Sequence, residues 1–278
     1  MRDRHGGAKI AGGGIISGNA SMEGVEHSPH RACFRFYAEL NDHLPPERQY
    51  KTLEKSFFLP SAVKDMIESF GVPHTEVDLI VANGQSVGFS YLVQNGDRIA
   101  VYPMFESLDV TSEQRLRPSP LRNPKFVLDL HLGKLAAYLR MLGFDAEYGP
   151  SFADTRLVEI SAEEHRILLT RDRGLLMYAA VTHGYWVRET DSRKQVAEVI
   201  RRFDLAGAIQ PFTRCMACNG VLERISKEQA QNLVPEHAIE LYDEFQHCGQ
   251  CGRFYWRGSH YDRMRRWIRE LASDTSAR

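Results

Sequence analysis

Residues 166–177 read RILLTRDRGLLM, and this stretch decides how the middle of the chain folds. Ile167, Leu168 and Leu169 form a short apolar run typical of a buried strand, and Asp172 stands three positions after it. One Asp at such a place proves little, because strand ends and helix caps commonly carry this residue. The position becomes informative if other strands of the chain also end in a carboxylate.

The sequence from Lys125 onward alternates between short apolar runs and longer amphipathic segments. Their periodicities predict strands at residues 125–129, 145–149, 166–170 and 185–189, and helices at residues 130–143, 151–164, 173–184 and 192–203. Strands that alternate with helices form βαβ units, in which helices cover both faces of a parallel sheet. The pattern therefore predicts an α/β domain built on a parallel sheet.

Three of these predicted strands deliver an acidic residue at or just beyond their carboxyl ends, namely Asp129, Asp172 and Asp191. The carboxyl ends of parallel strands share one edge of the sheet, so these side chains are expected to lie close together. Asp154 reaches the same edge if its helix begins there. Crowded carboxylates need a cation among them, and Mg²⁺ or Mn²⁺ suits such oxygen ligands. We therefore expect Asp129, Asp172 and Asp191 to hold a catalytic Mg²⁺ or Mn²⁺ ion for phosphodiester hydrolysis, with Asp154 as a further catalytic candidate.

Two alternatives to this metal site stay open. Asp129, Asp154 and Asp191 each stand next to the start of a predicted helix, where an Asp can serve as the N-cap. Glu159 and Glu163 also compete with Asp154 for its place at the edge.

The residues around Asp172 offer further candidates. Arg171 and Arg173 are predicted phosphate contacts for RNA, with plain surface charges as the alternative. Thr170 either donates a hydrogen bond to a carboxylate or ends its strand. The strands are followed by no P-loop and no G-x-G-x-x-G fingerprint, which argues against nucleotide-binding versions of the fold, and no G-x-S-x-G elbow appears.

Four of the five cysteines form two C-x-x-C pairs, Cys215 with Cys218 and Cys248 with Cys251. Four thiolates close a tetrahedral site without an open position, which predicts a structural zinc ion. A redox motif, an iron–sulfur site and two disulfides are the alternatives. His237 and His247 are possible substitute ligands. The remaining Cys33 is predicted to be a buried thiol.

The tail after the second pair, RFYWRGSHYDRMRRWIRE, interleaves arginines with aromatic residues. Arg253, Trp256, Arg257 and His260 are its candidate RNA-binding residues, because arginines over phosphates and aromatic faces suit single-stranded RNA. The alternative is packing, in which Met264, Trp267 and Ile268 form the docked face of a helix.

The segment before residue 111 predicts a β-β-α-β-β order, with strands at residues 32–40, 52–59, 78–84 and 96–103. Its helix covers residues 61–70, with Ser61 as N-cap and Gly71 after its end. The motifs VANGQSV and LVQNGDRIAVYP resemble ubiquitin-like sulfur-carrier domains of the MoaD/ThiS type, which implies a β-grasp fold. Carrier domains end in a free Gly-Gly tail, whereas this strand runs on into further chain. The segment is therefore expected to bind a protein partner or RNA.

The motifs FVLDLHLGKLAAYLRMLGFD, ILLTRDRGL and ETDSRKQ resemble the PIN-like nuclease superfamily, and within it the Mut-seven C-terminal (Mut7-C) RNase family. The likeness continues through WRGSHY in the tail. It implies metal-dependent hydrolysis of RNA by an acidic cluster, carried here by Asp129, Asp172 and Asp191, and less directly by Asp154. A ubiquitin-like domain before the nuclease and a zinc ribbon attached to it are also implied.

The expected organisation has five parts: a disordered extension at 1–30, a ubiquitin-like domain at 31–110, a Pro/Arg-rich linker at 111–124, a nuclease domain at 125–210, and a zinc ribbon with a basic aromatic helix at 211–278. The formal net charge of −1 confines any nucleic-acid surface to a local patch. No apolar run is long enough to span a membrane. The extension lacks a signal peptide's apolar core, which predicts a cytoplasmic protein and leaves Met22 open as an alternative start.

The expected partner is RNA, either tRNA or another structured or single-stranded RNA. The ribosome is a second candidate partner. Two other functions compete with the ribonuclease. One is a non-catalytic RNA- or ribosome-binding factor, and the other is an adaptor that docks to a sulfur-transfer or tRNA-modification enzyme.

Overall fold

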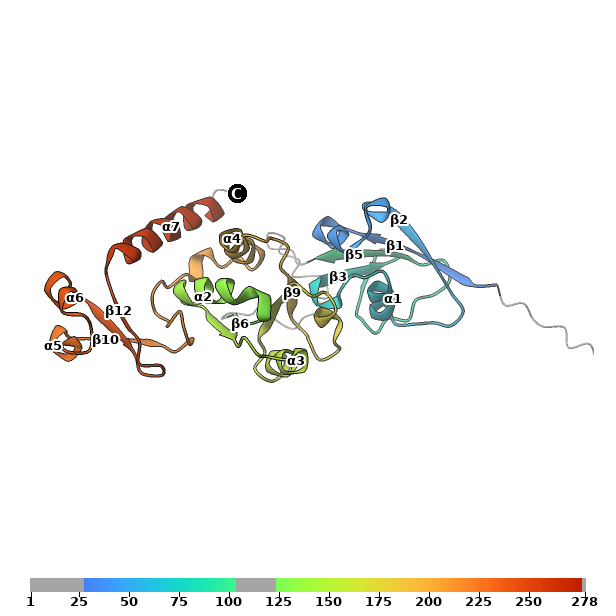
Figure 1. Ribbon diagram of the computed structural model, residues 1–278. Coiled ribbons are helices and arrows are strands. Elements are labelled where there is room, and N and C mark those ends of the chain that lie inside the picture. The colour runs from blue at the N-terminus through green and yellow to red at the C-terminus, as the bar shows by residue number, and fades with distance from the viewer. Residues whose placement is uncertain (1–27, 104–123, 277–278) are drawn as a thin grey trace, which may run out of the picture.

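The computed structural model describes residues 28–103 and 124–276, with side chains described as far as Leu271. Three sheets follow one another along an elongated molecule, in the order in which they occur in the sequence (Figure 1). The predictions for the extension before residue 28, including the start at Met22, and for nearly all of the 111–124 linker lie outside the described residues.

The first sheet has five strands in the order β2-β1-β5-β3-β4, with β1 and β5 parallel and the other neighbours antiparallel. The strands are β1 (His30–Phe36), β2 (Thr52–Phe57), β3 (Val77–Ala82), β4 (Gln85–Val87) and β5 (Arg98–Pro103). The helix α1 (Val63–Ser69) packs on this sheet through Val63, Met66 and Ile67. This mixed sheet with one helix is a β-grasp fold and confirms the predicted order, with β4 as an additional strand.

Three local predictions in this part of the chain are wrong. The strand expected to reach residue 40 ends at Phe36, because the Asn41 side-chain amide donates to the carbonyls of Phe36 and Ala38 and turns the chain into a 3-10 helix, η1 (Ala38–His43). Ser61 is not the cap of α1, since its hydroxyl donates to the Leu59 carbonyl. Cys33 is half-buried rather than buried.

The second sheet is fully parallel, in the order β7-β6-β8-β9. Its strands are β6 (Lys125–Leu128), β7 (Asp145–Tyr148), β8 (Ile167–Thr170) and β9 (Gly184–Trp186). The helices α2 (Gly133–Met141) and α4 (Ser192–Arg202) share one apolar cluster with it, and α3 (Asp154–Glu163) packs in a second cluster on the other face. The predicted parallel sheet with helices on both faces is thus confirmed.

The helix predicted over residues 173–184 is wrong. Only one 3-10 turn forms there, η5 (Leu175–Met177). Leu175, Leu176 and Val181 are buried, but their spacing does not repeat along one face of a helix, so a short 3-10 turn followed by irregular chain buries them equally well. The Val181 carbonyl also accepts a hydrogen bond from His74, which lies in the first sheet's domain.

A buried polar cluster joins the first two sheets. Glu76, at the end of a 3-10 helix η3 (His74–Glu76), accepts hydrogen bonds from the His43 ring at 2.8 Å and from the backbone N–H of Trp186 at 2.6 Å. The Arg188 guanidinium donates to the same carboxylate at 3.0 Å. Glu76 therefore satisfies a donor on β9, an edge strand of the parallel sheet.

The third sheet is a small antiparallel one of order β10-β11-β12. It comprises β10 (Leu222–Ile225), β11 (Phe245–Cys248) and β12 (Phe254–Trp256), with α5 (Lys227–Ala230) and α6 (Glu236–Leu241) between the first two strands. The terminal helix α7 (Ser259–Ser276) then turns back over the parallel-sheet unit (Figure 1). Ile268 and Leu271 are buried in the same cluster as α2 and α4, which confirms the docked helix face.

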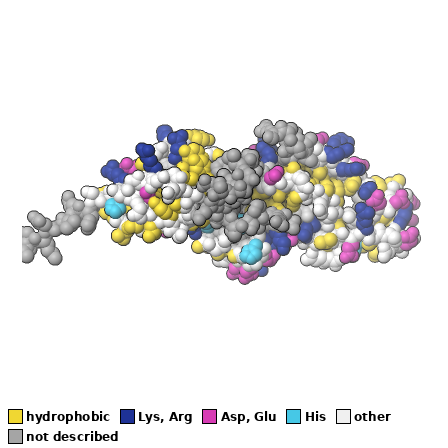
Figure 2. Space-filling model, turned by 180° about the vertical axis from the view of Figure 1, so that it is seen from behind, with side chains coloured by type: hydrophobic (Ala, Val, Ile, Leu, Met, Phe, Trp, Pro, Cys, Tyr) yellow, Lys and Arg dark blue, Asp and Glu magenta, His cyan; other side chains and the backbone are white. Residues whose placement is uncertain are grey.

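Acidic and basic side chains are interspersed over the ribbon end of the molecule in the rear view (Figure 2), in keeping with a formal net charge of −1. Among the described residues, no helix has the length and apolar character needed to cross a membrane.

Candidate functional site

The acidic residues singled out from the sequence follow the strands of the parallel sheet. Asp129 comes directly after β6, Asp172 follows β8 by two residues, and Asp191 follows β9 by five. Because β6, β8 and β9 are adjacent and parallel, their carboxyl ends share one edge of the sheet. This edge is the usual place for a site in open α/β sheets.

Asp129 is the buried member of the group, with 5% of its surface exposed. One carboxylate oxygen accepts from the backbone N–H of His131 at 2.9 Å. The other accepts from the backbone N–H of Arg171 at 2.8 Å and from the Thr170 hydroxyl. The Thr170 hydroxyl in turn accepts from the backbone N–H of Asp172 at 2.8 Å, so this one group connects two of the acidic positions. Thr170 is thus a hydrogen-bond donor to a carboxylate.

Asp172 and Asp191 are exposed, and each has one oxygen engaged with backbone. Oδ1 of Asp172 accepts from Gly174 at 2.8 Å. Oδ1 of Asp191 accepts from the N–H groups of Arg193 and Lys194 and caps α4. Capping therefore occurs at Asp191, and also at Asp129 before the 3-10 helix η4 (Leu130–Leu132), without excluding metal ligation by the remaining lone pairs.

Asp154 is the first residue of α3, and the cap position belongs to Ala153. Its side chain is exposed, as are those of Glu159 and Glu163 on the same helix. Glu159 is ion-paired with Arg156 at 3.1 Å. None of these three is joined to Asp129 by a hydrogen bond among the described residues.

The two arginines beside Asp172 make contacts within the protein. The Arg171 guanidinium donates to the carbonyls of Val187, Arg188 and Glu189 and so holds the chain after β9. Arg173 donates to the His43 carbonyl at 3.2 Å and lies over the Trp186 ring. These contacts favour structural roles over phosphate binding for both arginines.

The four paired cysteines converge on one point. Their Sγ atoms all lie within 4.8 Å of one another, and among the described residues they form the one such group of three or more His, Cys, Asp or Glu side chains. The separations of 3.6 Å between Cys215 and Cys251 and 3.4 Å between Cys218 and Cys248 are close to the about 3.8 Å that tetrahedral zinc–thiolate bonds require. The donor set therefore fits a structural zinc ion. His237 and His247 lie outside the cluster.

Hydrogen-bond donors surround the sulfur atoms. The Tyr255 hydroxyl donates to Cys215 Sγ at 3.0 Å, and backbone N–H groups of Ala217 and Cys218 point at the same atom. Burial raises the pKa of the Cys215 thiol, but these donors outweigh it and lower the pKa to about 6. At Gly220 a Cβ would meet Cys248 Sγ at 3.0 Å, so the turn after the first pair needs glycine.

The first cysteine turn is anchored on the parallel sheet by residues that sequence reasoning missed. Arg140, buried on α2, donates to the carbonyls of Met216, Ala217 and Ala146. Asn219 accepts from the Ala146 backbone N–H at 3.0 Å. The CNG motif marks Asn219 as a turn residue, but no pattern in the sequence indicates its partner on β7.

The predicted RNA contacts of the tail lie around the third sheet. Arg253 and His260 are exposed, and His260 hydrogen-bonds Arg263 at 3.2 Å. Trp256 is half-buried and packs on the small core of the ribbon. Arg257 pairs with Glu244 at 2.7 Å and lies over the Tyr261 ring. The set is thus spread over the sheet and the first turn of α7.

Comparison with protein families assigns both halves of the chain. Residues 30–109 match the Mut7-C ubiquitin family, and residues 124–268 match the Mut7-C RNAse domain. No curated protein and no solved structure matched the chain in these comparisons. The RNase match spans the parallel sheet, the four-cysteine ribbon and most of the described part of α7, and it indicates nuclease activity on RNA. The chain therefore belongs to the Mut7-C RNase family, with a Mut7-C ubiquitin domain in front of the nuclease.

Proposed function

We propose that the protein is a metal-dependent ribonuclease that hydrolyses RNA phosphodiester bonds at the acidic edge of its parallel sheet. The observation that carries this proposal is the delivery of Asp129, Asp172 and Asp191 to one edge by three adjacent parallel strands, within a domain of an RNase family. Asp154 belongs to the proposal through its position at the start of α3.

The donor chemistry of this edge suits Mg²⁺ or Mn²⁺, since the candidate ligands are all carboxylates. Oδ2 of Asp172 and Oδ2 of Asp191 accept no hydrogen bond from described residues, which leaves them available as ligands. The acids do not meet within 4.8 Å as the four cysteines do. Mg²⁺ keeps several of its waters, so part of the ligation can pass through them. When bound, the ion supplies charge neutralisation at the phosphate and a more acidic water.

Hydrogen bonds from neighbouring residues hold the acidic side chains of this edge in position. The Thr170 hydroxyl and the backbone N–H of Arg171 hold one oxygen of Asp129 in place. The hydroxyl also sets the position of the Asp172 backbone, so the two acids keep a constant relation. Exposed Asp172 and Asp191 are then open to an RNA phosphate approaching from solvent.

The other parts of the molecule support the reaction without chemistry of their own. Zinc at the four cysteines stabilises the ribbon, and arginines of the tail bind RNA. The ubiquitin-like domain offers a surface for a protein partner or RNA. The ribosome is a candidate partner, and the cytoplasm is the proposed location.

Cleavage of end-labelled tRNA and single-stranded RNA by the purified protein tests the proposal. Cleavage is expected with Mn²⁺ or Mg²⁺ and is expected to fall by at least about 100-fold in the Asp129→Asn and Asp172→Asn variants, because each loses a charged ligand. Asp204→Asn, an exposed acid just after the C-terminal end of α4, is the matched control and should cleave at close to the wild-type rate. Metal-dependent cleavage that survives both Asp substitutions contradicts the assignment.

A second candidate function is RNA binding without cleavage. The observation that favours it is the lack of convergence of the acids to within 4.8 Å in the described part of the chain. Tight, salt-sensitive RNA binding without turnover in Mn²⁺, unchanged in the Asp129→Asn/Asp172→Asn double variant, would establish it.

A further inference from the structure

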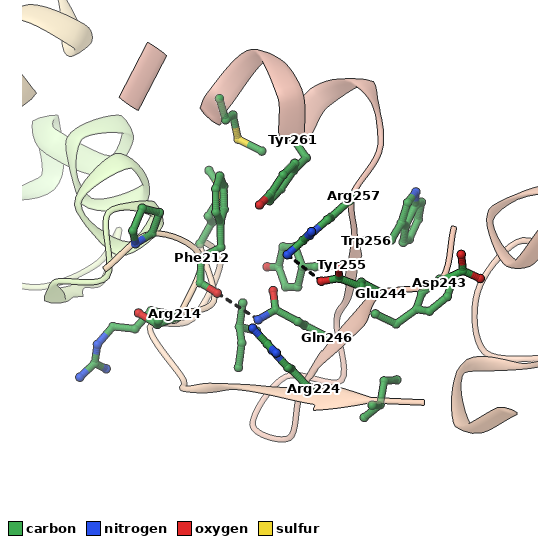
Figure 3. Close-up of a pocket in the computed structure, with 17 residues that line it drawn as sticks. Phe212, Arg214, Arg224, Asp243, Glu244, Gln246, Tyr255, Trp256, Arg257 and Tyr261 are labelled. Carbon is green, nitrogen blue, oxygen red and sulfur yellow. Dashed lines mark hydrogen bonds and ion pairs between the residues drawn. The ribbon is translucent and has the colours of Figure 1, made fainter. Parts of the chain in front are cut away.

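A groove with a volume of about 500 Å³ lies between the ribbon sheet, residues 211–214 and the start of α7. Figure 3 shows its side chains converging from these three segments, with Gln246 and Tyr255 near the centre. A cavity of this size is in the range that holds small organic ligands or single nucleotides.

One wall of the groove is a row of side chains across the three strands of the ribbon. Arg224 on β10 pairs with Gln246 on β11, and Gln246 pairs with Tyr255 on β12. Residues paired directly across strands project from the same face of a sheet. The row thus places a guanidinium, an amide and an aromatic ring side by side. The Gln246 Nε2 donates to the Phe212 carbonyl at 3.1 Å, which turns its amide oxygen to the groove as an acceptor.

The facing wall is aromatic. The rings of Phe212 and Tyr261 have centroids 4.5 Å apart at an interplanar angle of 36°, and both residues are half-buried. Trp256 and Met264 also line the groove. Partly accessible rings in a narrow groove are suited to stacking with flat heterocycles, and every nucleobase offers such a face.

The charge that remains available in the groove is positive. Asp243 is paired with Lys227, and Glu244 is paired with Arg257. Arg214 points away from the groove (Figure 3) and donates to the Asn219 carbonyl. Arg224 is exposed and makes no ion pair within the described part of the chain, so its guanidinium is free to meet a phosphate.

The helix α7 connects this groove with the acidic edge. Tyr261 stands in the groove, and Trp267 follows it by six residues, about 9 Å along a helix. Arg193 lies over the Trp267 ring at 5.5 Å, and its own backbone N–H is held by Asp191. The helix carries exposed arginines between these two points, at positions 263, 265 and 266, and a further one just beyond Trp267, at position 269. A basic path therefore runs from the groove to the carboxylates.

We propose that this groove is a binding site for single-stranded RNA, which holds one base between the Phe212–Tyr261 wall and the Arg224–Gln246–Tyr255 row. The backbone of the strand then follows the arginines of α7 toward the acidic edge. This inference deepens the proposed ribonuclease function and rests on it for the direction of the strand. A peptide is the competing occupant, but the stacking walls and the free guanidinium favour a nucleotide.

Fluorescence anisotropy of a short labelled single-stranded RNA tests the site with the zinc-loaded full chain, without added Mg²⁺ or Mn²⁺. Arg224→Glu is expected to weaken binding by about tenfold or more, because it reverses a charge in the groove. Arg48→Glu is the matched control, an exposed arginine on a 3-10 helix, η2 (Pro46–Arg48), of the first domain, and is expected to leave the affinity unchanged. Equal RNA affinity of the Arg224→Glu and wild-type proteins overturns the proposal, and a peptide then remains as the candidate ligand of the groove.

A second readout reports stacking. An RNA that carries 2-aminopurine is expected to lose fluorescence on binding, and Tyr261→Leu is expected to restore most of it while circular dichroism stays as in the wild type. Duplex RNA is expected to compete poorly, and equal competition by the duplex contradicts base stacking. The Asp129→Asn/Asp172→Asn variant separates the two proposals, because it is expected to lose cleavage and to retain RNA binding. If the groove variants bind RNA as well as the wild type, only the proposed groove site is wrong. If the Asp variants still cleave RNA, only the proposed nuclease site is wrong.

Discussion

At the scale of single residues, the Thr170 hydroxyl is the group that relates the acidic positions to each other. It is fully buried, donates to Asp129 and accepts from the backbone N–H of Asp172. A strand residue with both a donor and an acceptor is needed here, because a carboxylate and an N–H must be satisfied by the same atom. Thr also has the β propensity that suits the end of β8.

Replacement of Thr170 by Val keeps the shape of the side chain and removes the hydroxyl. The Asp129 carboxylate and the Asp172 N–H each lose a buried partner, so the free energy of unfolding is expected to fall by about 1–3 kcal/mol. Cleavage is expected to fall as well, because the two acids lose their common support. Urea denaturation and cleavage rates measure both effects.

Thr170→Ser is the control, since it keeps the hydroxyl and loses only a methyl group. Its cleavage rate is expected to stay near that of the wild type. A Val variant that cleaves as fast as the Ser variant would show that the hydroxyl has no part in placing the acids.

The sequence was sufficient to predict the placement of the acids at one edge, because the alternation of strands and helices predicts a parallel sheet, and the carboxyl ends of parallel strands share one edge. A hydrogen bond from Thr170 to a carboxylate was one of two alternatives that the sequence left open. The sequence could not predict that the acceptor is Asp129, that the same hydroxyl accepts from the Asp172 N–H, or that Arg171 and Arg173 make contacts within the protein. These contacts depend on tertiary neighbours that no local pattern encodes.

At the scale of elements, local periodicity predicted most helices and strands correctly and failed where the chain is held by other segments. The helix expected over residues 173–184 does not form, and the Val181 carbonyl in this segment accepts a hydrogen bond from His74 of the first domain. The predicted convergence of the four paired cysteines is confirmed, because C-x-x-C spacing constrains the sulfur atoms of each pair directly. Their attachment to the nuclease sheet was not predictable.

That attachment makes the ribbon part of the nuclease fold. Arg140 is 3% exposed and joins α2 to the first cysteine turn, while Asn219 continues the hydrogen bonding of β7. Zinc removal is therefore expected to raise amide hydrogen exchange both in residues 213–220 and in β7, and to leave β1–β5 protected. Exchange mass spectrometry of the zinc-loaded and chelated proteins measures this.

Cys33→Ser, which alters a thiol on β1, is the control and should bind zinc and exchange as the wild type does. If β7 keeps its full protection after zinc loss, the ribbon is an independent unit and the coupling through Arg140 is negligible.

At the scale of the whole molecule, buried charged groups connect the ubiquitin-like domain with the nuclease, and no apolar core cluster of the described residues spans both. Burial alone would raise the pKa of Glu76, but the hydrogen bond from His43 and the charge of Arg188 outweigh it and lower the pKa from 4.5 to about 2. A buried carboxylate held in its charged form by partners from two domains favours one relative position of those domains, because any other leaves the charges unpaired.

The pKa of Glu76 predicts how stability depends on pH. A carboxyl group whose pKa is lower in the folded than in the unfolded protein stabilises the fold above its unfolded value, and this contribution disappears as the pH falls from 4.5 toward about 2. Glu76→Gln is therefore expected to be less stable than the wild type at pH 7, and the difference between the two is expected to shrink over that acid window. Glu47→Gln, an exposed acid on η2, is the matched control and should follow the wild-type curve. Urea denaturation at a series of pH values measures the difference, and a Glu76→Gln deficit that stays constant down to pH 2 would mean that packing, rather than the charge of Glu76, holds the two domains together.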